Sequence, residues 1–135
     1  MTSPFDLPVP TEAEEQMAFV DWLELCGLRF SHVPMSTFTK HMSVKMQNHR
    51  LGVRAGVPDM LVLISPQRSK DHHGHLIWVE MKRRKGGTVS HEQREWIEAF
   101  LELDSPNIDA VVARGWDEAR EAIVKHLANP PVSMF

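Results

Sequence analysis

The chain has 135 residues, of which 42% are hydrophobic and 24% are charged, and its formal net charge is -3 at pH 7. This length suits one compact domain, and the balance of residues excludes a disordered or fibrous protein. No apolar run approaches the roughly 20 residues needed to span a bilayer, and the N-terminus lacks the basic and apolar parts of a signal peptide. We therefore expect a cytoplasmic protein that has no membrane partner.

The domain organisation is predicted from the two ends of the chain. Residues 1–10 contain three prolines and are expected to form an extended N-terminal arm. Residues 11–128 carry all the predicted helices and strands and form the folded domain. Residues 129–135 are expected to be a loose C-terminal tail. The single cysteine, Cys26, has apolar neighbours, which indicates a small core residue rather than a nucleophile.

The first predicted helix runs from Glu12 to about Cys26. Thr11 is its predicted N-cap, Glu14 three residues later completes a capping box, and Gly27 ends the helix. Its apolar stripe is predicted from the residues that recur at helical spacing, namely Ala13, Met17, Val20 and Leu23.

Three strands are predicted in the middle of the chain. Residues 28–33 suit a short strand, and residues 39–51 form a basic stretch that is either a helix or an ordered loop. Residues 59–64 and 76–82 are apolar, rich in β-branched residues and typical of buried strands. The polar segment 65–75 between them favours a hairpin-like antiparallel pair, although parallel pairing remains open.

A second capping box opens the next predicted helix, with Ser90 as N-cap and Gln93 three residues later. Residues 108–113 suit a further strand, and Gly115 precedes a last helix with acidic residues in its first turn. The apolar face of the helix after Ser90 is predicted from Trp96, Ile97, Phe100 and Leu101.

The charged residues on the two predicted buried strands suggest a metal-binding catalytic site. Residues two apart on a strand point to the same face, so Glu80 and Lys82 project together, and antiparallel pairing would bring Asp59 beside Glu80. Carboxylates are the hard oxygen ligands that magnesium prefers, and the main-chain carbonyl of Met81 could add a third ligand. A surface ion pair worth about 0 to 1 kcal/mol is the alternative for Glu80 and Lys82 alone. Charged groups on a buried strand, however, need a partner such as a metal ion.

Three segments, taken in order, resemble the VRR-NUC nuclease family of the PD-(D/E)xK superfamily. They are residues 52–59 (GVRAGVPD), 78–87 (WVEMKRRKGG) and 90–93 (SHEQ), and the turn at 114–116 fits the same order. The resemblance covers most of the chain. It implies an α/β fold of the restriction-endonuclease-like type, with a mixed central β-sheet flanked by α-helices. It also implies a likeness to the small stand-alone members of the family, many of them phage-encoded.

The resemblance implies a role for each matching residue. Asp59 and Glu80 match the ligands of Mg2+ or Mn2+, and Lys82 matches the residue that holds the attacking water and stabilises the transition state. Glu12 matches the acid of the first helix, with Gln16 on the same helical face as a secondary candidate. Gln93 matches the family glutamine. Helix capping or the helix dipole could also explain Glu12 and Gln93, and Glu15 is the alternative first-helix acid.

The function implied is that of a metal-dependent DNA endonuclease that cuts branched or distorted DNA, similar to Holliday-junction resolvases that act as homodimers in DNA repair. A flap or single-strand nuclease of replication or repair shares every motif, and a non-catalytic DNA-binding module is the third alternative. We expect no small-molecule organic cofactor. The predicted contacts to the DNA backbone are basic residues near the site, namely Lys40, Lys45, Arg54, Arg83, Arg84 and Lys85.

Overall fold

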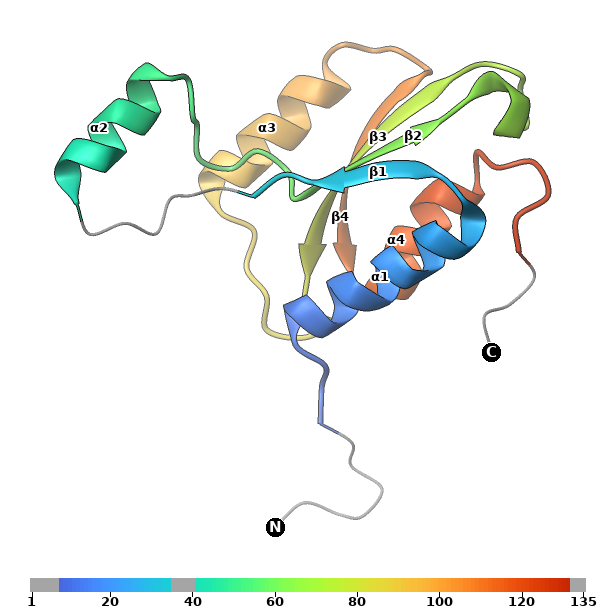
Figure 1. Ribbon diagram of the computed structural model, residues 1–135, viewed down its shortest axis with the longest axis horizontal. Coiled ribbons are helices and arrows are strands. Elements are labelled where there is room, and N and C mark those ends of the chain that lie inside the picture. The colour runs from blue at the N-terminus through green and yellow to red at the C-terminus, as the bar shows by residue number, and fades with distance from the viewer. Residues whose placement is uncertain (1–7, 35–40, 132–135) are drawn as a thin grey trace.

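A mixed sheet of four strands, in the order β1-β2-β3-β4, forms the centre of the molecule (Figure 1). The computed structural model describes residues 8–34 and 41–131. Strand β1 pairs antiparallel with β2, β2 antiparallel with β3, and β3 parallel with β4. The predicted antiparallel pair is therefore confirmed, and so is the mixed sheet. The strands are β1 (Arg29–His32), β2 (Met60–Ile64), β3 (His75–Lys82) and β4 (Ile108–Arg114).

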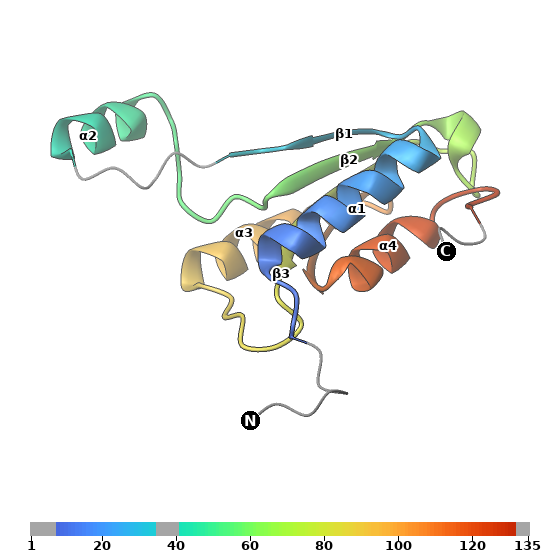
Figure 2. The ribbon, with the colours of Figure 1, turned by 60° about the horizontal axis from the view of Figure 1, so that its bottom comes forward.

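Helices cover both faces of the sheet. Helices α1 (Glu12–Cys26) and α4 (Trp116–Val124) lie side by side over one face, where they enclose the main hydrophobic core (Figures 1 and 2). Helix α3 (His91–Leu101) covers the opposite face, where Phe100 stacks on Trp78 with ring centroids 5.3 Å apart. None of the described helices is both long and apolar enough to cross a membrane.

Helix α2 (Met42–Arg50) stands away from the sheet in both views, and none of its residues is buried (Figures 1 and 2). The sequence left a helix or an ordered loop open for this basic stretch, and the structure shows a helix. Lys40, one of the predicted DNA contacts, lies outside the described residues.

The predicted ends of α1 are confirmed. The Thr11 side chain accepts a hydrogen bond from the Glu14 main chain, the Glu14 side chain accepts one from Thr11, and Gly27 ends the helix in a left-handed conformation. The predicted apolar stripe is only partly right, because α1 turns its larger aromatic residues to the core: Leu23 is buried and Val20 packs against the core. Met17, in contrast, is 59% exposed. The buried face consists of Glu15, Phe19, Trp22, Leu23 and Cys26.

The predicted apolar face of α3 is also only partly right. Trp96, Ile97 and Phe100 are half-buried, whereas Leu101 is 52% exposed. The helix contacts the sheet mainly at β4, and Phe100 of its last turn stacks on Trp78 of β3.

An ion-pair network that includes one buried acid joins α1, α4 and the end of β3. The carboxylate of Glu15, whose side chain is 3% exposed, lies 2.8 Å from Nε of Arg84, and a second nitrogen of Arg84 lies 2.7 Å from Asp117. Gly115 has a φ of +97°, and a Cβ there would lie 2.7 Å from Oε2 of Glu15. Glycine at this position therefore leaves room for the network at the start of α4.

We expect Arg84→Ala to lower the free energy of unfolding by about 3 kcal/mol, because it leaves the buried Glu15 carboxylate without its cation. Lys125→Ala is the control, since Lys125 pairs with Asp109 at 3.1 Å but is 55% exposed, and a pair of that kind is worth about 0 to 1 kcal/mol. Urea denaturation monitored by circular dichroism would measure both. Equal losses in the two variants would contradict a structural role for the network.

Candidate active site

Asp59 and Glu80 lie next to each other at the open end of the β2–β3 pair. The strand pairing ends with Met60 opposite Val79, which places Asp59 beside Glu80 one residue further on. The main-chain N–H of Asp59 donates to Oε2 of Glu80 at 3.1 Å, and the main-chain N–H of Met81 donates to Oδ2 of Asp59 at 2.9 Å. Each carboxylate thus accepts a main-chain hydrogen bond from the opposite strand, which fixes the two acids next to each other.

Glu80 is only 2% exposed, which is exceptional for a carboxylate. Its Oε1 accepts a hydrogen bond from Nε2 of Gln93 at 2.6 Å and lies 3.8 Å from Nζ of Lys82. Burial raises the pKa of Glu80 to about 8, and the neighbouring Asp59 carboxylate acts in the same direction, whereas Lys82 opposes it. One ammonium group therefore does not compensate the two acids, and a further cation at this position would be stabilised.

The start of α3 supplies Gln93 to the site. The predicted capping box is present, because the Ser90 hydroxyl accepts from the Gln93 N–H and the Gln93 Oε1 accepts from the Ser90 N–H. The same Gln93 amide donates through Nε2 to Glu80. The sequence left capping and a site role as alternatives for Gln93, and the geometry allows both through the two ends of one amide.

The loop that precedes Asp59 is held against α3. A Cβ on Gly56 would lie 2.6 Å from the main-chain oxygen of Glu92, and Gly56 has a φ of +91°, so only glycine lets the loop approach the helix this closely. The indole N–H of Trp96 donates to the Ala55 carbonyl at 3.0 Å. The sequence placed Trp96 on the apolar face of this helix, because no pattern within α3 reveals a hydrogen bond to a loop some 40 residues earlier.

His32 contacts Asp59 from the side of α1. The Asp59 carbonyl accepts hydrogen bonds from the Val33 N–H at 2.7 Å and from Nδ1 of His32 at 2.9 Å, and the Gln16 amide lies 3.2 Å from the same ring nitrogen. No motif of the sequence assigns His32 to the site. Its place in the site depends on the pairing of β1 with β2. The sequence of a strand of only four residues does not predict its partner strand.

Of the two acids considered on the first helix, Glu12 is the one that faces the site. Partial burial raises the pKa of Glu12, the charge of Asp59 raises it further and that of Lys82 lowers it, so all three lie within electrostatic reach. Glu15 is instead paired with Arg84. The structure therefore brings Glu12, Asp59, Glu80, Lys82 and Gln93 together around the end of the sheet.

The predicted DNA-contacting residues fall into two groups. Lys45 and Lys85 are exposed. The three arginines are engaged within the domain: Arg54 donates to the His49 and Val53 carbonyls, Arg83 to those of Val9 and Pro10, and Arg84 pairs with Glu15 and Asp117. A role of these residues in DNA binding stays a prediction.

The donor atoms at the site suit a hard divalent cation. Asp59 and Glu80 offer carboxylate oxygens at one position, and the Met81 carbonyl remains the predicted third oxygen ligand. Among the described residues, no group of three or more His, Cys, Asp or Glu side chains is arranged as a metal site. Any metal ion held here would therefore rely on the two acids together with main-chain, water or substrate oxygens.

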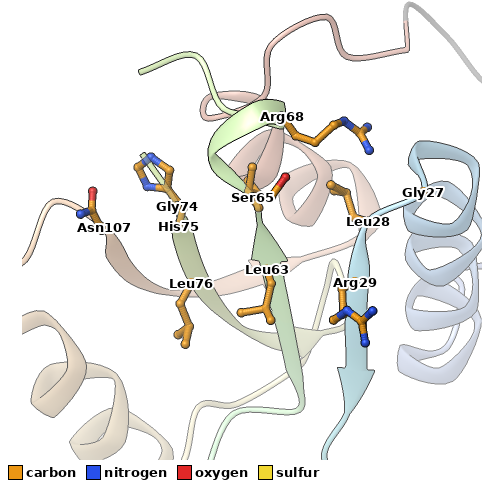
Figure 3. Close-up of a pocket in the computed structure, with 11 residues that line it drawn as sticks. Gly27, Leu28, Arg29, Leu63, Ser65, Arg68, Gly74, His75, Leu76 and Asn107 are labelled. Carbon is orange, nitrogen blue, oxygen red and sulfur yellow. The ribbon is translucent and has the colours of Figure 1, made fainter. Parts of the chain in front are cut away.

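Two other features lie away from this end of the sheet. Asp71 accepts hydrogen bonds from Ser69, His73 and His75 within its own turn, as expected of a polar loop. A hollow of about 540 Å³ lies where β2 ends and β3 begins, with Leu63 and Leu76 projecting from adjacent strands on the same side (Figure 3). It is at the opposite end of these strands from Asp59 and Glu80, so it is no part of the acidic cluster.

A mixed sheet between helices, with an acid before one strand and a Glu-x-Lys sequence on the next, defines a restriction-endonuclease-like α/β domain. The VRR-NUC domain model matches residues 10–117, and the chain belongs to this family. A solved structure of a VRR_NUC domain protein is 25% identical, with a TM-score of 0.62 over 88% of this chain and 89% of that chain. No curated protein matches the sequence. Family membership implies a nuclease domain, with DNA as its partner.

Gly56→Ala should lower the free energy of unfolding by about 2 kcal/mol or more, because a left-handed non-glycine residue costs roughly 1 to 2 kcal/mol and the added methyl group also meets the α3 backbone. Gly52→Ala is the matched control: Gly52 has a φ of +98° but nothing within 4 Å of a built Cβ. Thermal unfolding of both variants measures the difference. A Gly52→Ala variant as unstable as Gly56→Ala would show that contact with α3 contributes nothing.

The buried Glu80 predicts a pH dependence of stability in the metal-free protein. The folded state retains a proton on Glu80 up to about pH 8, whereas the unfolded chain releases it near 4.5. Stability from this group is therefore complete below the lower pKa and is lost as the pH rises through the upper one. In EDTA, Glu80→Gln should melt above the wild type at about pH 9 and close to it at about pH 4.

The matched control for this measurement is Glu98→Gln on the exposed surface of α3. It should follow the wild-type melting temperature at both pH values. A Glu80→Gln variant that lost stability in parallel with the wild type between the two pH values would contradict the assignment to Glu80.

Proposed function

We propose that this protein is an endonuclease that hydrolyses phosphodiester bonds in branched DNA with Mg2+ or Mn2+ as cofactor. The observation that carries the proposal is the pair of adjacent carboxylates at the end of β2 and β3, one of them buried, with Lys82 3.8 Å from Glu80. Such an incompletely compensated pair has no structural use of its own, and perturbed acids of this kind cluster at functional sites. The proposal includes a cytoplasmic location.

Each residue of the site has a defined task in this proposal. Asp59 and Glu80 hold the metal ion, which when bound supplies Lewis-acid stabilisation of negative charge on the phosphate. Gln93 fixes the orientation of Glu80 through its hydrogen bond to Oε1. Lys82 orients the attacking water and stabilises the negative charge of the transition state, a task that its position beside the acids supports. Glu12 faces the same space and is the candidate to accept a proton.

The preference for branched DNA and a homodimeric assembly belong to the same proposal, and both derive from the family resemblance. Paired cuts across a junction need two active sites, which a symmetric dimer provides. The alternatives are a flap or single-strand nuclease and a DNA-binding module without catalysis. The presence of Asp59, Glu80 and Lys82 together favours an enzyme over the binding module. Carboxylates repel the phosphates of DNA, so a protein that only bound DNA would bind it more weakly because of them.

Lys82→Ala and Asp59→Asn should each lower kcat by about a hundredfold or more, because they remove transition-state stabilisation or a metal ligand. DNA binding, measured by fluorescence anisotropy in EDTA, should be little changed. Lys70→Ala is the control for Lys82→Ala, since Lys70 is an exposed lysine at the other end of the sheet. Wild-type cleavage that persisted in excess EDTA would end the metal-dependent mechanism.

The substrate is tested on labelled four-way junction, flap, splayed, single-stranded and duplex DNA, each with Mg2+ and with Mn2+. The proposal expects the fastest cleavage on the junction and a dimer in sedimentation velocity. Faster cleavage of flap or single-stranded DNA by a monomer would support the flap-nuclease alternative. If none of the five DNAs were cleaved, the DNA-binding module without catalysis would be the alternative that remains.

A further inference from the structure

A hollow of about 680 Å³ lies along the flank of α1 and reaches the candidate active site. Asp59 and Glu12 line it, and both also belong to the acidic cluster at the end of the sheet. The volume is within the range of about 300 to 1,000 Å³ that is usual for small-molecule sites. A DNA strand with its phosphate at Asp59 therefore has space for a neighbouring part of the strand beside α1.

The hollow offers both apolar and polar contacts. Met17 and Val20 supply apolar surface, and Met17 is 59% exposed, so it contributes little to the core. Gln16 and His32 supply polar groups. Nδ1 of His32 lies 2.9 Å from the Asp59 carbonyl oxygen and 3.2 Å from Nε2 of Gln16, which leaves the other ring nitrogen, Nε2, for a ligand. No described residue is bonded to that Nε2.

Away from the proposed metal ion at Asp59, the charge of the hollow disfavours a phosphate group as its occupant. Glu12, Asp21 and Asp59 line it, whereas none of the described lining residues is a lysine or arginine. Phosphate would be repelled by these carboxylates, but the uncharged base and sugar of a nucleotide would not. A base that has left the helix is bound between aromatic or apolar side chains, with hydrogen bonds to its edge.

We propose that this hollow is a subsite for one unpaired nucleoside adjoining the scissile phosphate. The inference rests on the proposed nuclease function and specifies its substrate class: branched DNA in which at least one nucleotide beside the cut leaves its pair at the branch point. A base within a duplex is stacked and paired, so it cannot enter a side pocket unless it leaves the helix. Met17 contacts the face of the base, and Gln16 and Nε2 of His32 bind its edge.

The test begins with a flap substrate whose cut has been mapped, in which the unpaired nucleotides beside the cut are then replaced one at a time by abasic sites. For the wild type, one replacement should lower kcat/KM by about tenfold, the loss typical of one base contact, mainly through KM. In Met17→Ala and His32→Asn the intact substrate should already show this loss, and the abasic change should add little. His32→Asn keeps a donor near the position of Nδ1 but removes Nε2.

Leu25→Ala is the matched control, because Leu25 lies on the same helix and is 58% exposed but does not line the hollow. It should retain the wild-type response to the abasic change. A second readout needs no cleavage: in a Lys82→Ala background with Mg2+, 2-aminopurine at the subsite position should brighten on binding as it leaves its stacked neighbours. Met17→Ala added to that background should abolish the change.

The outcomes separate the subsite from the proposed function. Cleavage of none of these DNAs would refute the nuclease proposal itself. Normal cleavage with the same abasic response in the wild type, Met17→Ala and His32→Asn would overturn the subsite and leave the nuclease proposal intact. Cleavage of fully paired duplex DNA as fast as the flap would also overturn it.

Discussion

The buried carboxylate of Glu80 is the constraint on which the arrangement of this site depends. A charged or polar group removed from water must find hydrogen-bond partners in the protein. Glu80 takes one from the main chain before β2 and one from Gln93 on α3, and Lys82 of its own strand lies nearby. The start of β2, the end of β3 and the first turn of α3 therefore converge on one side chain, and the contact of Gly56 with α3 holds that convergence together.

A comparison of the two buried acids separates a structural site from a functional one. Glu15 and Glu80 are 3% and 2% exposed. Glu15 faces a guanidinium at 2.8 Å, which neutralises it at short range. Glu80 has a neutral amide as its closest side-chain partner, an ammonium only at 3.8 Å and a second carboxylate beside it. The protein thus fixes the position of Glu80 without placing a cation in close contact with its carboxylate. The proposed metal ion would be that cation.

The sequence predicted the four strands and the helices α1, α3 and α4, because caps, turns and apolar runs are local signals, whereas it left α2 open as a helix or an ordered loop. It also predicted that Asp59 and Glu80 meet, since antiparallel pairing at a strand end fixes their proximity. It could not predict which stripe of α1 is buried, because two interleaved sets of apolar residues share helical spacing and only packing selects between them. His32 and Trp96 were missed for a related reason: both contact main-chain carbonyls of distant segments, which no local pattern encodes.

The engagement of the arginines bears on how a chain of net charge -3 could recognise DNA. Arg84 is paired with two acids of its own domain, and Arg54 and Arg83 donate to main-chain carbonyls, which lowers the number of cations and donor groups left for DNA. Nonspecific affinity for duplex DNA grows with the number of phosphates that a protein neutralises. Fewer free cations mean weaker attachment to ordinary duplex, so more of the binding free energy must come from contacts at the cut itself. On the proposed function, this balance favours discrimination between distorted and regular DNA, because only a strand that can leave the helix reaches the hollow beside α1.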